Sequence, residues 1–331
     1  MANAVFSPRD FKAWIIEEAT PGTAPTITSG LYQLDVDSVA FPSLNPNQVL
    51  DVRSRTGRVL HKSDFFQDNE MRAVELSLSG TYHNDGGLSL LLHNVCANTM
   101  NAASIADASV VAAATGVSGK YGTSQADATF TLVLAPPDTD DGYNTLLTGC
   151  QCTSFSISAD SGTEGGLYKW SATVSTGFNP TTNDATAEAG TAYGAGLISL
   201  SGLGTKTVGA ATVILSSFDV TVESPAVYSG VSSNGYEAFS RGSEISITAN
   251  ATVKYDSATR GLFHTFNTQT AATEGSMLVL TQGTATNCSI SMPDAVFTDV
   301  VFNEGDIMML DVSMKAVSDG SSALITFDLA S

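Results

Sequence analysis

Two segments of the chain alternate between apolar and polar residues with a period of two. Residues 73–82 read AVELSLSGTY and residues 245–255 read ISITANATVKY. This alternation is typical of an antiparallel strand that buries one face and exposes the other. The pattern therefore predicts one long, half-buried strand in each half of the chain.

A short amphipathic helix is predicted directly after each of these strands. The first is followed by HNDGGLSLLLHNV and the second by DSATRGLFHTFNT. Asn, Asp and Ser favour helix N-termini, and the apolar residues that follow recur at helical spacing. The residues expected to pack these helices onto a sheet are Leu88, Leu91 and Leu92 in the first and Leu262, Phe263 and Phe266 in the second.

The order of the remaining apolar segments also recurs. Three further pairs of predicted strands match in order, namely 128–136 with 275–283, 150–158 with 294–302, and 168–177 with 307–320. An earlier strand at 31–41 similarly matches 211–222. Because the order strand, strand, helix and three strands occurs twice, we interpret the chain as an internal duplication. The expected fold class is mainly β with minor α content, in two tandem β-sandwich or barrel domains, each with one short flanking helix.

Domain boundaries follow from this repeat. The first domain is expected over residues 1–180 and the second over 211–331, with a Gly-, Ala- and Thr-rich linker or arm at 181–210. The first domain also contains a long loop at 43–70 and an Ala- and Ser-rich insertion at 97–127.

Composition supports a folded chain and argues against a nucleic-acid binder. The 331 residues are enough for two domains, and 43% of them are apolar, which is too many for a disordered chain. The sequence contains 14 Lys and Arg residues and 33 Asp and Glu residues, so the formal net charge is −19. A protein that binds DNA by neutralising phosphates needs the opposite balance.

A search for catalytic and metal-binding motifs gives nothing specific. The four histidines lack zinc-site spacing, and no nucleophile elbow or phosphate-binding loop is present. Asp138, Asp140 and Asp141 lie in a Pro/Asp/Gly turn, with a calcium loop as the alternative. Cys150 and Cys152 fall on one face of a strand and are expected to be buried thiols. We therefore expect no enzyme activity, no metal and no cofactor, and neither a secretory leader nor a membrane span.

One charged feature stands apart from the acidic background. Within the 43–70 loop lie five basic or titratable residues, Arg53, Arg55, Arg58, His61 and Lys62. A loop of this length is usually functional or disordered. Three interpretations remain open: a solvated hairpin, a nonspecific DNA contact, or contact with the acidic surface of another copy of the chain.

Several of these segments resemble the tail tube proteins, or major tail proteins, of long-tailed bacteriophages (siphophages). The resemblance lies in the opening KAWIIEEATPGTAP, in VELSLSGTYHNDGGLSLLLHNV, and in the late strands CTSFSIS and KWSATVSTG. It extends over nearly the whole chain, but it is one of pattern. Many members carry one tube domain per chain and form hexameric rings. The doubled unit here resembles the duplicated branch, in which a homotrimer forms a pseudo-hexameric ring.

The resemblance implies a structural virion protein of the phage tail, made in the host bacterial cytoplasm. It would self-assemble into stacked rings that form a tube. The lumen of the tube would be acidic, and DNA would pass through it during ejection without specific binding. Its partners would be other copies of itself, the tape measure protein, and the tail terminator and tip proteins. The basic residues of the 43–70 loop then become candidates for contact between rings. The alternative is a phage surface, decoration or adhesin-like β-sandwich binding module.

Overall fold

Strands dominate the computed structural model, which confirms the mainly β class expected from the alternating segments. The structure describes residues 7–37, 39–41, 47–50, 65–68, 74–83, 86–96, 109–113, 129–137, 144–178, 180–183, 190–193, 197–232, 235–241, 245–268, 278–282, 289–317 and 323–328.

In the described part of the first half, residues 7–183, one α-helix lies among the strands. Its elements are η1 (Pro8–Asp10), β1 (Lys12–Glu17), β2 (Leu31–Leu34), β3 (Asn47–Leu50), β4 (Phe65–Asp68), β5 (Val74–Thr81), α1 (Gly86–Val95), β6 (Ser109–Ala113), β7 (Phe130–Ala135), β8 (Asn144–Asp160), η4 (Glu164–Gly166), β9 (Lys169–Thr176) and β10 (Thr181–Asn183).

The second half, residues 203–328, follows a short connection made of β11 (Gly190–Thr191) and η5 (Leu200–Gly202). Its elements are β12 (Leu203–Val208), β13 (Ala211–Thr212), β14 (Leu215–Glu223), β15 (Ala226–Ser232), β16 (Gly235–Arg241), β17 (Ser246–Lys254), α2 (Arg260–Thr268), β18 (Leu278–Gln282), β19 (Ser289–Met292), β20 (Ala295–Glu304), β21 (Met308–Ala316) and β22 (Ala323–Asp328).

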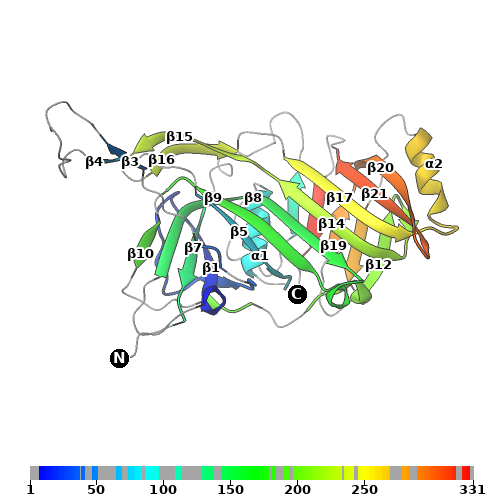
Figure 1. Ribbon diagram of the computed structural model, residues 1–331, viewed down its shortest axis with the longest axis horizontal. Coiled ribbons are helices and arrows are strands. Elements are labelled where there is room, and N and C mark those ends of the chain that lie inside the picture. Colours follow the sequence, from blue (N-terminus) through cyan, green and yellow to red (C-terminus); the bar gives the residue numbers. More distant parts are fainter. Residues whose placement is uncertain are drawn as a thin grey trace.

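One sheet runs through both halves. Seven of its strands lie in the order β5–β9–β8–β14–β17–β21–β20, and all neighbouring pairs are antiparallel. We call these strands the seven-stranded sheet. The halves meet where β8 pairs with β14, from Ser154 opposite Glu223 to Asp160 opposite Ser217. In Figure 1 the strands of this sheet run side by side across the molecule, and α2 lies at the end that belongs to the second half.

The strand pairing of the first half recurs in the second. In the seven-stranded sheet, β5–β9–β8 corresponds to β17–β21–β20. On the other side of the core, β2–β1–β7–β8–β10 corresponds to β13–β12–β18–β19–β22. The hairpin β3–β4, which precedes β5, likewise corresponds to β15–β16, which precedes β17.

Local irregularities recur at the same places. The pairing of β8 with β9 shifts register between Cys152 and Ser154, and that of β20 with β21 shifts between Phe297 and Asp299. These β-bulges occupy equivalent positions in the two pairing schemes, with one extra residue, a threonine, in each strand.

The ends of β5 and β17 are fixed in the same way. The backbone N–H of Tyr82 donates to the carbonyl of Tyr168 at 2.9 Å, and that of Tyr255 donates to the carbonyl of Met308 at 3.0 Å. Each tyrosine directly follows its strand, and a helix is the next element along the chain, so the two strand–helix units have the same order.

The two helices lie in different surroundings. In α1, Leu88, Leu91 and Leu92 are buried, and the helix packs on β8, β1 and β2. In α2, only Leu262 is buried, Phe266 is partly buried, and Phe263 is 40% exposed. The expected packing stripe of α2 therefore faces the core on one side only, through its contact with β20.

Several segments contain more strand than the sequence indicated. Residues 181–210, expected to be a linker or arm, include β10, β11 and the whole of β12, which pairs with β18. The 97–127 insertion includes β6, which pairs with β22 of the second half. Short strands of this kind lack a clear apolar period, and distant pairing decides their structure.

The 17-residue strand β8 serves both layers of the first half. Its early part pairs with β7, and its later part enters the seven-stranded sheet. It bends at Gly149, whose φ of +63° favours glycine, and a Cβ there would lie 2.2 Å from the ring of Phe178. In the second half the equivalent path is broken between β19 and β20, where Pro293 has no N–H to donate to a ladder.

A buried carboxylate holds this bend. Glu18 is only 6% exposed, and one of its carboxylate oxygens accepts hydrogen bonds from the N–H of Gly149 at 2.8 Å and from Thr131 Oγ1 at 2.6 Å. The other oxygen accepts from Thr129 Oγ1 at 2.6 Å and from the N–H of Gly22 at 2.7 Å. Hydrogen bonds from four donors replace the water that the charge loses on burial.

We expect Glu18→Ala to lower the free energy of unfolding by about 3 kcal/mol, because it leaves several buried donors without an acceptor. Chemical denaturation measures the change. The control is Glu304→Ala, which removes an exposed carboxylate at the end of β20 and should change the free energy of unfolding little. Equal effects for both variants would contradict the role given to Glu18.

Candidate functional site: the polar face of the seven-stranded sheet

The seven-stranded sheet has one apolar face and one polar face. Side chains such as Phe155, Val220 and Val312 point into the core. Their strand neighbours point to the opposite side and define the polar face. Its members are Glu75, Ser77, Ser79, Thr81, Ser154, Ser156, Ser158, Asp160, Lys169, Ser171, Thr173, Ser175, Ser217, Asp219, Thr221, Glu223, Ser246, Thr248, Asn250, Thr252, Lys254, Val296, Asp299, Val301, Asn303, Met309, Asp311, Ser313 and Lys315.

Hydroxyl groups dominate this face. Of the 29 side chains, 15 are Ser or Thr. The register places five of them in one continuous row across the strands, Ser79, Ser171, Ser156, Thr221 and Thr248. The Oγ atoms of Ser156 and Ser171 lie 2.8 Å apart, within hydrogen-bond distance. The row crosses the junction between the halves without interruption.

The charge of the polar face is weakly negative. Six carboxylates (Glu75, Asp160, Asp219, Glu223, Asp299 and Asp311) accompany three lysines (Lys169, Lys254 and Lys315). The carboxylate of Asp311 accepts from Thr252 Oγ1 at 2.7 Å and from Asn303 Nδ2 at 3.0 Å. Lys169 pairs with Glu164 at 2.9 Å and donates to Thr81 Oγ1 at 3.0 Å. Asp311 and Lys169 are therefore engaged by neighbouring side chains.

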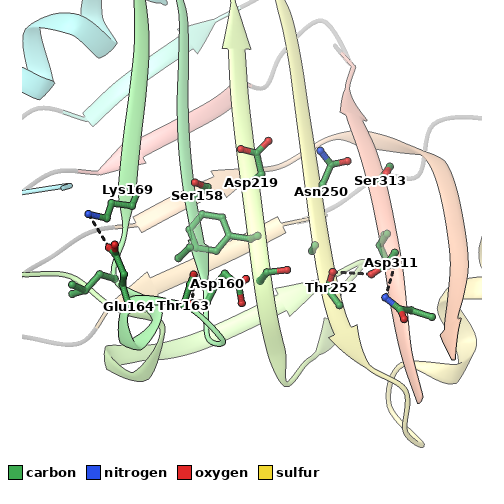
Figure 2. Close-up of a pocket in the computed structure, with 17 residues that line it drawn as sticks. Ser158, Asp160, Thr163, Glu164, Lys169, Asp219, Asn250, Thr252, Asp311 and Ser313 are labelled. Carbon is green, nitrogen blue, oxygen red and sulfur yellow. Dashed lines mark hydrogen bonds and ion pairs between the residues drawn. The ribbon is translucent and has the colours of Figure 1, made fainter. Parts of the chain in front are cut away.

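The polar face is hollowed where it crosses the junction. Figure 2 shows this depression, whose volume is about 620 Å³, with Ser158, Asp219, Asn250 and Ser313 side by side on adjacent strands. Residues from β8, β14, β17, β21 and β20 all contribute to its lining. The hollow therefore extends over strands of both halves, and Thr163, Glu164 and Leu167 after β8 also line it.

One carboxyl group of this face is partly desolvated. Burial raises the pKa of Asp219 above its ordinary value, and side-chain hydrogen bonds from Thr221 and Asn250 oppose the shift. The Thr221 hydroxyl donates to the Asp219 carboxylate at 3.2 Å. An ionised Asp219 at neutral pH therefore carries a cost that an amide would not carry.

Two titratable side chains of the core have pKa values shifted by burial. Burial, and secondarily the nearby Glu18, raises the pKa of the Cys150 thiol well above its ordinary value, which leaves it protonated and unreactive. Burial lowers the pKa of His93, which keeps that imidazole neutral. Within the described ranges no three His, Cys, Asp or Glu groups converge to hold a metal ion.

Several predicted functional residues cannot be placed. Arg53, Arg55, Arg58, His61 and Lys62 lie outside the described residues, between β3 and β4. Asp138, Asp140 and Asp141 also lie outside them. In Figure 1, the hairpins β3–β4 and β15–β16 both lie toward the end of the molecule opposite α2.

The polar face itself was not identified from the sequence, although its signal was present. The polar positions of residues 73–82 and 245–255 are mostly Ser and Thr rather than Lys or Glu. An ordinary solvent-exposed strand face carries more charged side chains, so this substitution of hydroxyls for charges could have marked a specialised surface.

Comparison with known proteins gives one family. The family described as phage tail tube protein matches residues 12–320. A search of curated proteins found no significant match. No helix in the described part of the chain is long and apolar enough to span a membrane.

We expect Asp219→Asn to raise the Tm at pH 7. A carboxyl group whose pKa is raised by folding stabilises the native state only while it is protonated, and this contribution is lost as the pH rises through the folded pKa. The gain from the amide should therefore shrink as the pH falls below that pKa. Thermal unfolding between pH 3 and pH 8 tests this, with Glu223→Gln, an exposed residue of the same strand, as the control. A gain that is constant with pH would contradict the assignment.

Proposed function

The chain belongs to the phage tail tube protein family, and we propose that its copies assemble into stacked rings whose bore conducts DNA during ejection. The single observation that supports this most directly is the hollowed, hydroxyl-rich polar face, which extends continuously over strands from both halves. A curved sheet with its apolar side covered and its polar side hollow has the shape that a tube wall requires.

We propose further that three chains form each ring, with six-fold-like symmetry. The support is the recurrence of the pairing scheme, including equivalent β-bulges and equivalent tyrosine contacts, in the two halves. Each half would then take the place of one subunit of a six-membered ring. We propose residues 1–180 and 211–331 as the repeat units, with β10 added to the first and β12 to the second through their strand pairing. The segment between them contributes strands to both halves.

The chemistry of the polar face fits passage of DNA without retention. The net charge is weakly negative, so phosphates are repelled at long range, and few lysines are available to hold them. Ser and Thr hydroxyls offer short hydrogen-bonding groups that water can also satisfy. The lumen we propose therefore has a small net negative charge, and hydroxyls are the most frequent polar groups that line it.

Other partners follow from the same proposal. In the virion, the tube would enclose the tape measure protein and end at the terminator and tip proteins. Ring-to-ring contact would involve the basic residues between β3 and β4, where acidic surface of the next ring could receive them. Stacking of this kind is heterologous and generates a filament.

Purified protein is expected to form rings or tubes that are visible by negative-stain electron microscopy. Class averages down the tube axis should show six similar lobes per ring, while the mass per ring should correspond to three chains. A protein that stays monomeric at high concentration over a broad range of salt would contradict the proposed function. Six chains per ring would contradict the trimer alone.

Reversing the charge of the basic loop should separate ring formation from stacking. We expect Arg55→Glu combined with Arg58→Glu to leave the Tm unchanged and to stop elongation at single rings, because surface loops add little to stability. Arg55→Lys with Arg58→Lys is the matched control and should still form tubes. Normal tubes from the charge-reversed variant would show that the loop is not required between rings.

A further inference from the structure

Helix α1 buries a histidine whose ring has no hydrogen-bond partner. Nine of the ten residues of α1 are buried, and they include His93, which is 8% exposed. Among the residues that the structure describes, none forms a hydrogen bond with Nδ1 or Nε2 of His93. Ser89 lies one turn earlier, and its buried Oγ likewise has no described partner. Because residues four apart share one side of a helix, these three polar atoms lie on the same side of α1.

The second helix does not share this feature. When Leu88 of α1 is aligned with Leu262 of α2, Asn267 stands at the place of His93, and it is exposed. Buried polar side chains in native proteins nearly always have a hydrogen-bond partner, because each missing partner weakens the packing of the group that carries it. Docking of α1 therefore carries a cost that docking of α2 avoids.

Among the described residues, no carboxylate compensates a positive charge on His93. The elements that pack on α1 are β1, β2, β6 and β8. The sequence of β6 contains no titratable residue, and Glu18, just after β1, already accepts hydrogen bonds from four donors. The remaining titratable residues on these elements, directly after β2 or directly after α1 are Lys12, Glu17, Tyr32, Asp35, Cys96, Cys150, Cys152 and Asp160. Burial alone accounts for the lowered pKa of His93.

From this arrangement we infer that α1 is a pH-sensitive switch, in which protonation of His93 releases the helix from the core of the first half. The protonated ring would bring a charge and two N–H donors into a place where the described residues supply no acceptor, whereas water satisfies both donors once the helix has moved out. Helix α1 also contacts β6, which pairs with β22 of the second half. Release of α1 would therefore loosen a link between the two halves.

The direction of the pH effect follows from the lowered pKa of His93. In released α1 the imidazole binds a proton at the ordinary histidine value of about 6.5, whereas in docked α1 it does so only at lower pH. Docking is therefore most stable above the ordinary value, and its stability falls as the pH drops toward the pKa of the docked state. Between these two values release takes up one proton, so the equilibrium constant for release should rise about tenfold for each pH unit.

Thiol labelling of the full-length protein between pH 7.5 and pH 5 measures the release. Cys96 directly follows α1, and the backbone N–H of Cys152 donates to Asn94 Oδ1 of α1 at 2.7 Å; both thiols are buried while α1 is docked. The probe is 4,4′-dithiodipyridine, which reacts with thiols over this whole range, and peptide mapping assigns the labelled residues. We expect the labelling rate of Cys96, divided by that of the denatured chain at the same pH, to rise about tenfold per pH unit below the ordinary histidine value, while the far-UV strand signal stays unchanged.

Two variants at position 93 separate titration from packing. His93→Leu keeps the site apolar and should label slowly over the whole pH range, whereas His93→Gln, which is polar but does not titrate, should label faster without pH dependence. His264→Gln changes the exposed histidine of α2 and should label like the wild type. A wild type whose labelling does not accelerate in acid would overturn the inference without any variant. Acceleration that persists in both His93 variants, or that appears only together with loss of the far-UV strand signal, would also overturn it.

Discussion

The ladder between β8 and β14 is the interaction on which the rest of the structure depends. It joins the two halves over seven residue pairs and makes their sheets continuous. Without it, the polar face would be two separate surfaces, and the row of hydroxyls from Ser79 to Thr248 would be cut in the middle. The two repeats are therefore not independent domains on a tether, because backbone hydrogen bonds fix their relative position.

The position of this ladder depends in turn on the bend of β8. Gly149 permits the change of direction, and the buried carboxylate of Glu18 ties the bend to β7 and to the turn after β1. The second half reaches a similar path by a different device, the interruption at Pro293. Equivalent topology is thus maintained by unrelated local chemistry, which explains why the repeat is easier to see in pairing order than in matched residues.

Local patterns in the sequence predict much of the fold. The strict alternation in residues 73–82 and 245–255 and the helical spacing after each of them predicted β5, β17, α1 and α2, because burial of one face dictates these patterns. The bridging role of β8 could not be predicted, since its early part is buried on both faces and has no alternation. The sequence likewise could not show that β6 joins a sheet of the second half, since partners distant along the chain decide such pairing. The resemblance, together with the net charge of −19, implied an acidic lumen, whereas the register shows that hydroxyls outnumber carboxylates on the polar face.

The small size of those hydroxyl side chains has a mechanical consequence. In Ser and Thr, one rotatable bond positions the hydroxyl group. In Lys, Arg and Glu, several rotatable bonds let the charged group occupy many positions several ångströms apart. A wall lined with short side chains keeps its outline close to that of the backbone, so its clearance is set by the rigid hydrogen-bonded sheet. Thermal motion of the lining would then narrow a passage bounded by this face very little.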